Sequence, residues 1–192
     1  MGIMVKLNLI VGGIGGQGII TLGKMITSAC EKEGLKVLVS EMHGLAQRGG
    51  AVNIHVRIGD VYAPTIPLGG ADCIMGLETN EALRNLSYAN NKTLIILNEL
   101  SIRPVLPGII PKKVEEVEKL LSGYRVVKVN LKEISEKIGD KRVINSAILG
   151  FAYGLNVFPM ISESSFIETM RGENNVKSFY MGMRIAHDFI RN

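Results

Sequence analysis

A glycine-rich turn at residues 12–18 constrains this chain more than any other feature, because five of its seven residues are glycine. A short apolar run at residues 6–11 precedes the turn, and apolar residues recur at helical spacing over residues 19–29. Gly34 is the expected stop of that helix. Glycine allows positive φ and leaves backbone N–H groups unshielded. A helix that starts there adds unpaired N–H groups and the positive end of its dipole. The pattern therefore predicts a strand, an anion-binding turn and a helix.

The turn also matches G-x-G-x-x-G, the fingerprint of dinucleotide-binding domains, and Glu41 ends the next predicted strand, where such domains place an acidic residue. One alternative is therefore a stand-alone NAD(P)-binding oxidoreductase. A second is a turn that only lets a helix and a strand pack closely. We favour binding of an anionic cofactor through the turn, and the residues assigned to it are Gly13, Gly15, Gly16, Gln17 and Gly18.

The composition predicts one packed domain over residues 1–192, since 46% of the residues are hydrophobic and 21% are charged. Residues 143–192 change character and are expected to be a helical C-terminal part. No apolar stretch approaches the roughly 18 residues needed to cross a bilayer, and the N-terminus does not resemble a secretory signal. We therefore expect a cytoplasmic protein without a membrane segment.

The two cysteines, Cys30 and Cys73, fall on a predicted helix and a predicted strand. They are expected to be buried thiols in a reducing compartment. Two isolated cysteines cannot by themselves hold an iron–sulfur cluster or a structural zinc, so no metal site is expected here. The net charge of +4 suits anionic small molecules, whereas nothing in the sequence favours nucleic acid.

A polar segment at residues 41–50 follows the second predicted strand. In an open parallel sheet, loops at the carboxyl ends of strands share one crevice, so this segment should meet the glycine turn. Arg48 could hold a carboxylate or phosphate through two hydrogen bonds, or it could form a salt bridge to Glu41 or to a partner subunit. His43 could exchange a proton, although a structural hydrogen bond is an alternative. The residues assigned to orienting a ligand or partner are Glu41, His43, Gln47 and Arg48.

The remaining pattern predicts an α/β fold with a doubly wound, mostly parallel, Rossmann-like sheet, a hairpin insertion and C-terminal helices. The first two strands should form a parallel pair. Residues 51–58 alternate apolar and polar, and residues 61–63 should return as the hairpin partner. The polar side chains His55 and Arg57 should then be solvated or interfacial. Further strands are expected at 71–78, 92–98 and 125–129, and further helices at 81–89 (capped by Thr79), 113–121, 132–138, 143–152, after Ser162 and at the C-terminus.

Several stretches taken together resemble the gamma-type domain of 2-oxoacid:ferredoxin oxidoreductases over roughly residues 5–190. The resemblance is most specific where the glycine turn is followed by Glu-x-His-Gly and Gln-Arg-Gly-Gly. The matching residues are 13–18, 41–44, 47–52, 71–72, 78 and 81–84.

The resemblance implies a subunit that works inside a larger enzyme, in which 2-oxoacids, here arylpyruvates such as indolepyruvate, are oxidatively decarboxylated to acyl-coenzyme A. It implies that electrons pass to ferredoxin, and that thiamine diphosphate and the iron–sulfur clusters lie on a large partner subunit. The glycine turn would then contact coenzyme A, and residues 41–50 would face the thiamine-bearing chain. No catalytic residue is assigned to this chain. The alternatives are the NAD(P)-binding oxidoreductase and a non-enzymatic scaffold subunit that binds an anion or nothing.

Overall fold

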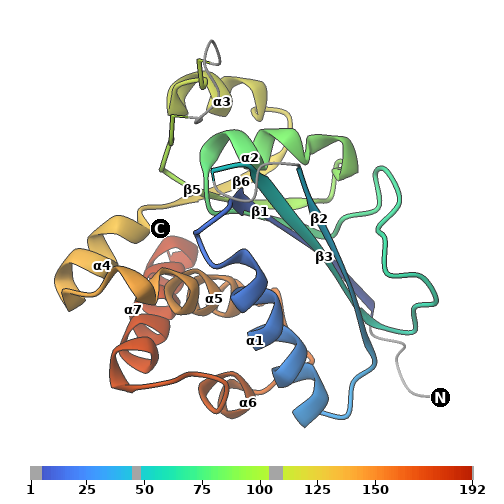
Figure 1. Cartoon of the computed structure of the whole chain (residues 1–192), viewed down its shortest axis with the longest axis vertical. Coiled ribbons are helices and arrows are strands. Elements are labelled where there is room, and N and C mark those ends of the chain that lie inside the picture. The colour runs from blue at the N-terminus through green and yellow to red at the C-terminus, as the bar shows by residue number, and fades with distance from the viewer. Residues whose placement is uncertain (1–5, 45–48, 104–109, 192) are drawn as a thin grey trace. The chain divides into compact units, whose positions relative to one another are not determined.

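The computed structural model describes residues 6–44, 49–103 and 110–191 of the 192-residue chain (Figure 1). It divides into two compact units, which we describe separately. The first unit comprises residues 1–23 and 36–129, and the second comprises residues 24–35 and 130–192. Helix α1 (Ile19–Lys32) begins in the first unit and continues into the second.

A six-stranded sheet forms the centre of the first unit, with the strand order β2-β3-β1-β4-β5-β6. Its strands are β1 (Lys6–Ile14), β2 (Val37–His43), β3 (Ala51–Gly59), β4 (Cys73–Gly76), β5 (Leu94–Asn98) and β6 (Arg125–Val129). The pairs β1–β4, β4–β5 and β5–β6 are parallel, and β3 runs in the opposite direction to the other five strands. This confirms the predicted mixed α/β class with a mostly parallel sheet.

The place of β3 in the sheet differs from the sequence-based prediction. β3 lies between β1 and β2 and is antiparallel to both, so the predicted pairing of the first two strands is wrong. A short connection suffices for an antiparallel neighbour, whereas a parallel one needs a crossover. The hairpin is therefore β2–β3. Residues 61–63 do not form its second strand, because the chain turns at Gly59 (φ 96°) and continues as a loop.

Both faces of the sheet are covered, which explains the continuous apolar run in β1. On one face α1 packs closely on β3, since a Cβ on Gly23 would come within 2.6 Å of Ile54 Cδ1. On the other face lie α2 (Thr79–Arg84), the short 3₁₀ helix η1 (Leu86–Tyr88) and α3 (Val114–Leu120). The core cluster that includes Ile10 contains buried residues of β4, β5 and α3.

His55 and Arg57 are buried rather than solvated, contrary to expectation. His55 Nδ1 accepts a hydrogen bond from the Ile66 amide at 3.0 Å. Arg57 donates to Asn8 Oδ1 at 2.9 Å and to the carbonyl oxygen of Ala63 at 2.8 Å. Burial, reinforced by the charge of Arg57, lowers the pKa of His55. These polar side chains fix the loop after β3 against the sheet, a role that alternation alone does not reveal.

The second unit is helical, as predicted for the C-terminal part. It contains the end of α1, α4 (Leu131–Ile138), the 3₁₀ helix η2 (Lys141–Val143), α5 (Ile144–Gly154), α6 (Glu163–Ile167) and α7 (Glu173–Arg191). Helices α5 and α7 lie side by side (Figure 1). Their backbones touch at glycines: a Cβ on Gly182 would overlap the carbonyl oxygen of Ala147, and one on Gly150 would overlap that of Phe179. Among the described residues, no helix is both long and apolar enough to span a bilayer.

The end of α1 is joined to α6 by Glu33. Its Oε1 accepts hydrogen bonds from the Ser162 amide at 2.8 Å and from Ser165 Oγ at 2.7 Å. These bonds lower the pKa of Glu33 to about 2. Ser162 caps α6 as predicted, because its side chain accepts from the Ser165 amide. Gly34, the second residue after α1, takes φ 67°, as expected of a helix stop.

Candidate functional site

The glycine turn follows β1 directly and is closed by its own hydrogen bonds. The Gln17 amide donates to the carbonyl oxygen of Ile14 at 3.0 Å. The Gln17 side chain bonds at both ends, since Oε1 accepts from the Ile14 amide at 2.7 Å and Nε2 donates to the carbonyl oxygen of Leu77 at 3.2 Å. Gln17 thus connects the end of β1 to the residue after β4. Gly16 and Gly18 have φ of 104° and 76°, which other residues adopt at a cost.

The segment around residues 49–50 meets the glycine turn, as predicted. The Gly15 amide donates to the carbonyl oxygen of Gly50 at 2.8 Å, and the Gly49 amide donates to that of Gly15 at 3.4 Å. This contact depends on the position of β3, which pairs with β1 as far as Ala51 opposite Ile14. The two loops therefore form one surface at the carboxyl end of β1.

Internal bonding reduces the number of amides that the turn can offer to an anion. The amides of Gly15 and Gln17 are already used within the chain. The Gly16 amide has no partner among the described residues, and the first-turn amides of α1 point out of the helix end. No acidic residue lies in that first turn. An anion would therefore be held at Gly16 and at the start of α1.

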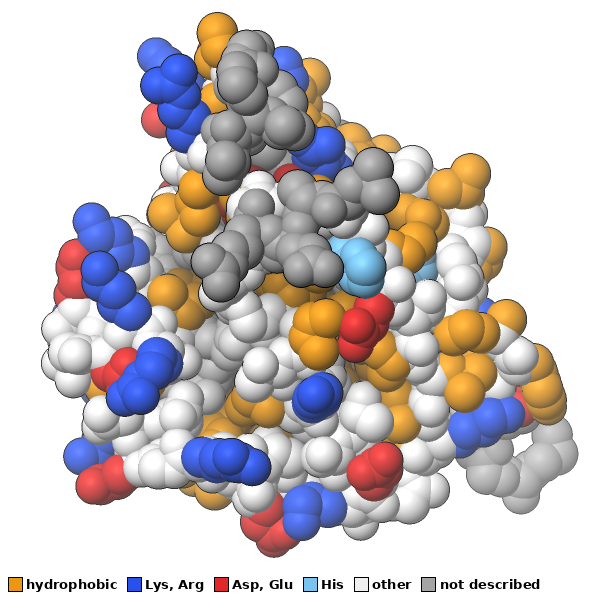
Figure 2. Space-filling view, in the orientation of Figure 1, with side chains coloured by type: hydrophobic (Ala, Val, Ile, Leu, Met, Phe, Trp, Pro, Cys, Tyr) orange, Lys and Arg blue, Asp and Glu red, His pale blue; other side chains and the backbone are white. Residues whose placement is uncertain are grey.

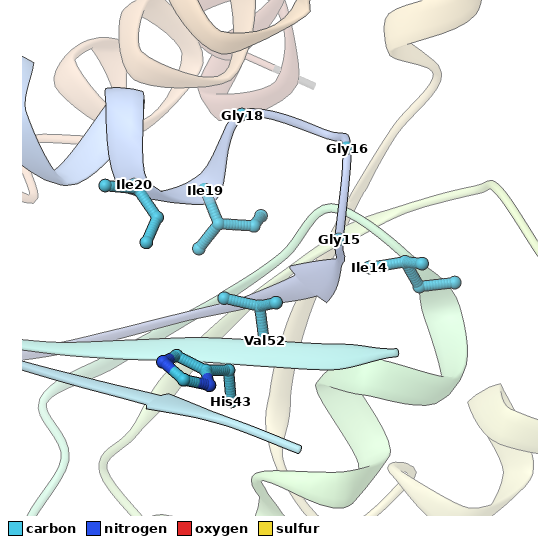
Figure 3. Close-up of a pocket in the computed structure, with 8 residues that line it drawn as sticks. All are labelled: Ile14, Gly15, Gly16, Gly18, Ile19, Ile20, His43 and Val52. Atoms are coloured by element: carbon cyan, nitrogen blue, oxygen red, sulfur yellow. The ribbon is translucent and has the colours of Figure 1, made fainter. Parts of the chain in front are cut away.

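A cavity of about 450 Å³ lies beside the turn (Figure 3). Figure 3 shows Ile19 and Ile20 directed from the start of α1 toward the strands, with Val52 and His43 opposite them. The residues lining the cavity are Ile14, Gly15, Gly16, Gly18, Ile19, Ile20, His43 and Val52. Backbone amides at one end and apolar side chains along the walls suit a long ligand with an anionic group and an apolar arm.

The predicted site residues do not all lie in this cavity. Gly15, Gly16, Gly18 and His43 line it together. Gly13 lies behind it, where a Cβ would come within 2.4 Å of Ile19 Cδ1, so Gly13 permits close packing as the second alternative supposed. Gln47 and Arg48 fall outside the described residues.

Glu41 is exposed on β2 and does not line the cavity. The insertion of β3 explains this. In a dinucleotide-binding fold the acidic residue ends a strand next to β1, roughly 5 Å away, whereas here β2 lies two strand spacings from β1, roughly 10 Å. Glu41 therefore lacks the placement that the NAD(P) interpretation requires.

A second cavity, of about 230 Å³, lies on the α2 side of the same strand end and was not predicted. Its lining residues are Ile14, Glu78, Asn80, Glu81, Leu83, Arg84, Ile102, Ile110, Pro111 and Lys112. Glu78, which is 1% exposed, caps α2 through Oε2, an acceptor for the Glu81 amide at 2.9 Å. Its Oε1 accepts from Asn80 Nδ2 and from the Ile102 amide, both at 3.1 Å.

The expectation that Thr79 caps this helix was wrong. The Thr79 hydroxyl donates to the carbonyl oxygens of Asn98 at 3.1 Å and Leu100 at 2.9 Å, so it is committed to β5 and the loop after it. Glu78 supplies the cap instead, because its carboxylate can accept from the helix amide and from the neighbouring loop together.

Glu81 is the most perturbed carboxyl group lining this second cavity. Burial raises its pKa to about 7, the nearby Arg84 opposes the shift, and the charge of Glu78 adds to it. Arg84 Nε lies 3.0 Å from Glu81 Oε1, while Oε2 makes no hydrogen bond to the described residues. The i,i+3 spacing of Glu78, Glu81 and Arg84 is the sequence signal that could have indicated this cluster, since it places all three on one helix face.

The two cysteines of this chain, Cys30 and Cys73, are both buried, as predicted. Burial raises the pKa of Cys30 to about 12 and also raises that of Cys73, so both are neutral thiols at neutral pH. Among the described residues, no group of three or more His, Cys, Asp and Glu side chains is placed to hold a metal ion. Basic and acidic side chains are interspersed on the face shown in Figure 2.

The sequence of this chain matches a known protein family and named members of it. Residues 8–185 match the family model described as pyruvate ferredoxin/flavodoxin oxidoreductase. The chain is 40% identical over 192 residues to indolepyruvate oxidoreductase subunit IorB of Archaeoglobus fulgidus, covering 94% of this chain and 96% of the relative. It is 37% identical to the protein of the same name from Methanothermobacter thermautotrophicus, covering 94% of each.

Two solved structures share the fold. The gamma subunit of a keto/oxoacid ferredoxin oxidoreductase from Geobacter sulfurreducens has a TM-score of 0.68 at 21% identity, covering 94% of this chain and 98% of that one. A 2-oxoglutarate:ferredoxin oxidoreductase from Magnetococcus marinus, solved with 2-oxoglutarate, coenzyme A and succinyl-CoA, has a TM-score of 0.72 at 22% identity. That match covers 95% of this chain but 31% of the other, where the fold is one part of a longer polypeptide.

Proposed function

We propose, because this chain belongs to the pyruvate ferredoxin/flavodoxin oxidoreductase family, that it is the subunit without iron–sulfur clusters of a 2-oxoacid:ferredoxin oxidoreductase. The substrate would be an arylpyruvate, such as the indolepyruvate that names its relatives. The assembled enzyme would release carbon dioxide, form an acyl-coenzyme A and pass electrons to ferredoxin. We treat residues 1–192 as one gamma-type domain in that assembly.

One observation supports this function most strongly: the glycine turn, the segment after it and the apolar cavity form an open surface at the end of β1. The amides at Gly16 and the start of α1 would receive a phosphate of coenzyme A. Ile19, Ile20 and Val52 would pack against its apolar arm. The neighbouring structure solved with coenzyme A agrees with this ligand class.

We assign the iron–sulfur clusters and thiamine diphosphate to a large partner subunit. The thiols of this chain do not fit a cluster, because the sequence has only two cysteines and a cluster is held by four. Thiamine diphosphate would supply the carbanion chemistry on the partner, while this chain positions the coenzyme. His43 and Glu41, exposed on β2, would orient the ligand or contact the partner. Gln47 and Arg48 remain proposed for the same role.

Reconstitution tests this function. The chain, its thiamine-bearing partner and their mixture are each assayed for viologen reduction that depends on both an arylpyruvate and coenzyme A. We expect activity in the mixture and in neither part alone. Turnover by the isolated chain would contradict the subunit assignment, and micromolar NADH binding to it would favour the NAD(P) alternative.

A further inference from the structure

The described residues that line the cavity beside the glycine turn carry no positive charge for the ligand proposed above. Among its described lining residues there is no Lys or Arg, and the turn offers few free amides. Coenzyme A carries a diphosphate and, separately, a 3′-phosphate monoester with a charge of about −1.5 to −2 at pH 7. Cations are the usual partners of such a group, Arg above all. Among the described residues, an Arg and a Lys instead line the adjoining cavity on the α2 side.

The cavity on the α2 side contains two cations with unused donors. Arg84 pairs with Glu81 through Nε only, and its two terminal nitrogens make no hydrogen bond to the described residues. Lys112 forms no ion pair with the described residues. The backbone of Lys112 is held in place, since its amide donates to Asn80 Oδ1 at 2.9 Å and its carbonyl oxygen accepts from Asn80 Nδ2 at 3.2 Å. One ligand group could thus meet a guanidinium and an ammonium.

The two cavities adjoin at the end of β1. Ile14 lines both of them. Helix α2 lies directly against the strand, because a Cβ on Gly12 would come within 3.2 Å of the carbonyl oxygen of Glu81 and 2.6 Å of Asn85 Nδ2. Glycine at position 12 therefore brings the Arg84 cavity next to the glycine turn. A ligand bound at Gly16 that extends past Ile14 would therefore enter the cavity lined by Arg84.

The two carboxyl groups in this cavity do not oppose a phosphate as strongly as their number suggests. Glu78 directs both oxygens to hydrogen-bond donors: the Glu81 amide, Asn80 Nδ2 and the Ile102 amide. Glu81 is largely buried, and its raised pKa means that protonation near neutral pH removes its charge. Proton uptake by Glu81 would also release Arg84 Nε for the ligand.

We propose that Arg84 and Lys112 bind the 3′-phosphate of coenzyme A, while Gly16 and the start of α1 bind its diphosphate. Leu83 and Ile102 then provide an apolar surface beside the ribose. The chain would in this way distinguish coenzyme A from analogues that lack the 3′-phosphate. This inference rests on the proposed function, specifically on contact between this subunit and coenzyme A.

The test compares binding of coenzyme A and 3′-dephospho-coenzyme A to the assembled enzyme by calorimetry. We expect the wild-type enzyme to bind coenzyme A roughly tenfold more tightly or better, as for a hydrogen bond between charged groups. Arg84→Gln and Lys112→Gln should each reduce this ratio toward one. Arg125→Gln, an exposed position on β6, is the matched control and should keep it. Circular dichroism checks that each variant is folded.

The pH dependence adds an independent readout. Relative to Glu81→Gln, the wild type should gain preference for coenzyme A as pH falls through about 7, because only the wild type loses a negative charge at this position. Titration of the 3′-phosphate itself, which has a second pKa of about 6, is common to both proteins and cancels in this comparison. The charged groups that act on Glu81 are Arg84 on the same helix and Glu78 at its N-cap, and Lys112 is the other charged residue that lines the cavity.

Different outcomes would contradict the phosphate assignment and the proposed contact between this chain and coenzyme A. Equal binding of the two ligands by the wild type, or a preference that survives in both Arg84→Gln and Lys112→Gln, would overturn the phosphate assignment and leave the coenzyme A contact standing. Coenzyme A binding by the partner subunit with the same affinity in the absence of this chain would overturn the contact itself.

Discussion

Replacing Glu81 by glutamine should change how the stability of this protein depends on pH. Glu81 is buried, with a folded-state pKa of about 7 against an ordinary value of 4.5. The folded state therefore holds a proton that the unfolded state releases between these values. Stability contributed by the protonated carboxyl is complete below pH 4.5 and is lost as pH rises through about 7. Glutamine, which is neutral throughout, removes this dependence.

The size of the effect follows from the difference between the two pKa values. Each unit corresponds to about 1.4 kcal/mol, so the wild type should lose about 3 kcal/mol relative to Glu81→Gln as pH rises through this range. Any change in packing adds an offset that does not vary with pH. Histidines and other carboxyl groups titrate equally in both proteins and cancel in the difference.

Urea denaturation between about pH 5 and pH 8 measures this difference. Glu115→Gln on α3, an exposed carboxyl that forms no ion pair with the described residues, is the control and should track the wild type at every pH. Parallel pH profiles for the wild type and Glu81→Gln would refute the reasoning, because they would mean that the Glu81 pKa is the same in the folded and unfolded states.

Three further changes test other parts of the structure. Gly182→Ala should force α5 and α7 apart, at about 3 kcal/mol and a Tm lower by about 6–12 °C; Gly123→Ala, with open space around it, is the control, and equal melting temperatures would contradict the close contact. Gln17→Ala should leave the buried Ile14 amide without its acceptor, costing about 1–3 kcal/mol in urea denaturation; no loss would mean that Gln17 does not fix the turn. Glu33→Gln should be less stable than the wild type at neutral pH, because its neutral oxygen accepts weaker hydrogen bonds than the carboxylate. The gap should close as pH falls from about 4.5 toward 2, since protonation of Glu33 removes the same charge; a gap that persists in acid would rule out ionised Glu33 as its cause.

The local signals of the sequence predicted much of this fold. The glycine turn, the helix after it, the Gly34 stop and the Ser162 cap all depend on nearby residues, and each is present. The contact between the turn and Gly50 was also predicted, but from loops of a parallel pair. It arises instead from the antiparallel pairing of β3 with β1, which brings the residues before Ala51 to the end of β1.

The sequence-based predictions were wrong where the structure depends on contacts between residues that are distant in the sequence. The placement of β3 between β1 and β2 depends on a pairing that the period-2 pattern does not specify. The burial of Glu81 depends on Gly12, which admits α2 against β1. Its surroundings also depend on Ile102 and Lys112, which lie well beyond it in the chain. No local rule indicates that a glutamate in the first turn of a short helix will be buried.

Amide hydrogen exchange of the assembled enzyme, with and without coenzyme A, tests the central claim most directly. The account predicts that coenzyme A protects two segments of this chain, the turn with the start of α1 (residues 14–22) and α2 (residues 79–85), while α5 and α7 are unchanged. Unchanged exchange in both segments at saturating coenzyme A would contradict it, because this chain would then not contact the coenzyme.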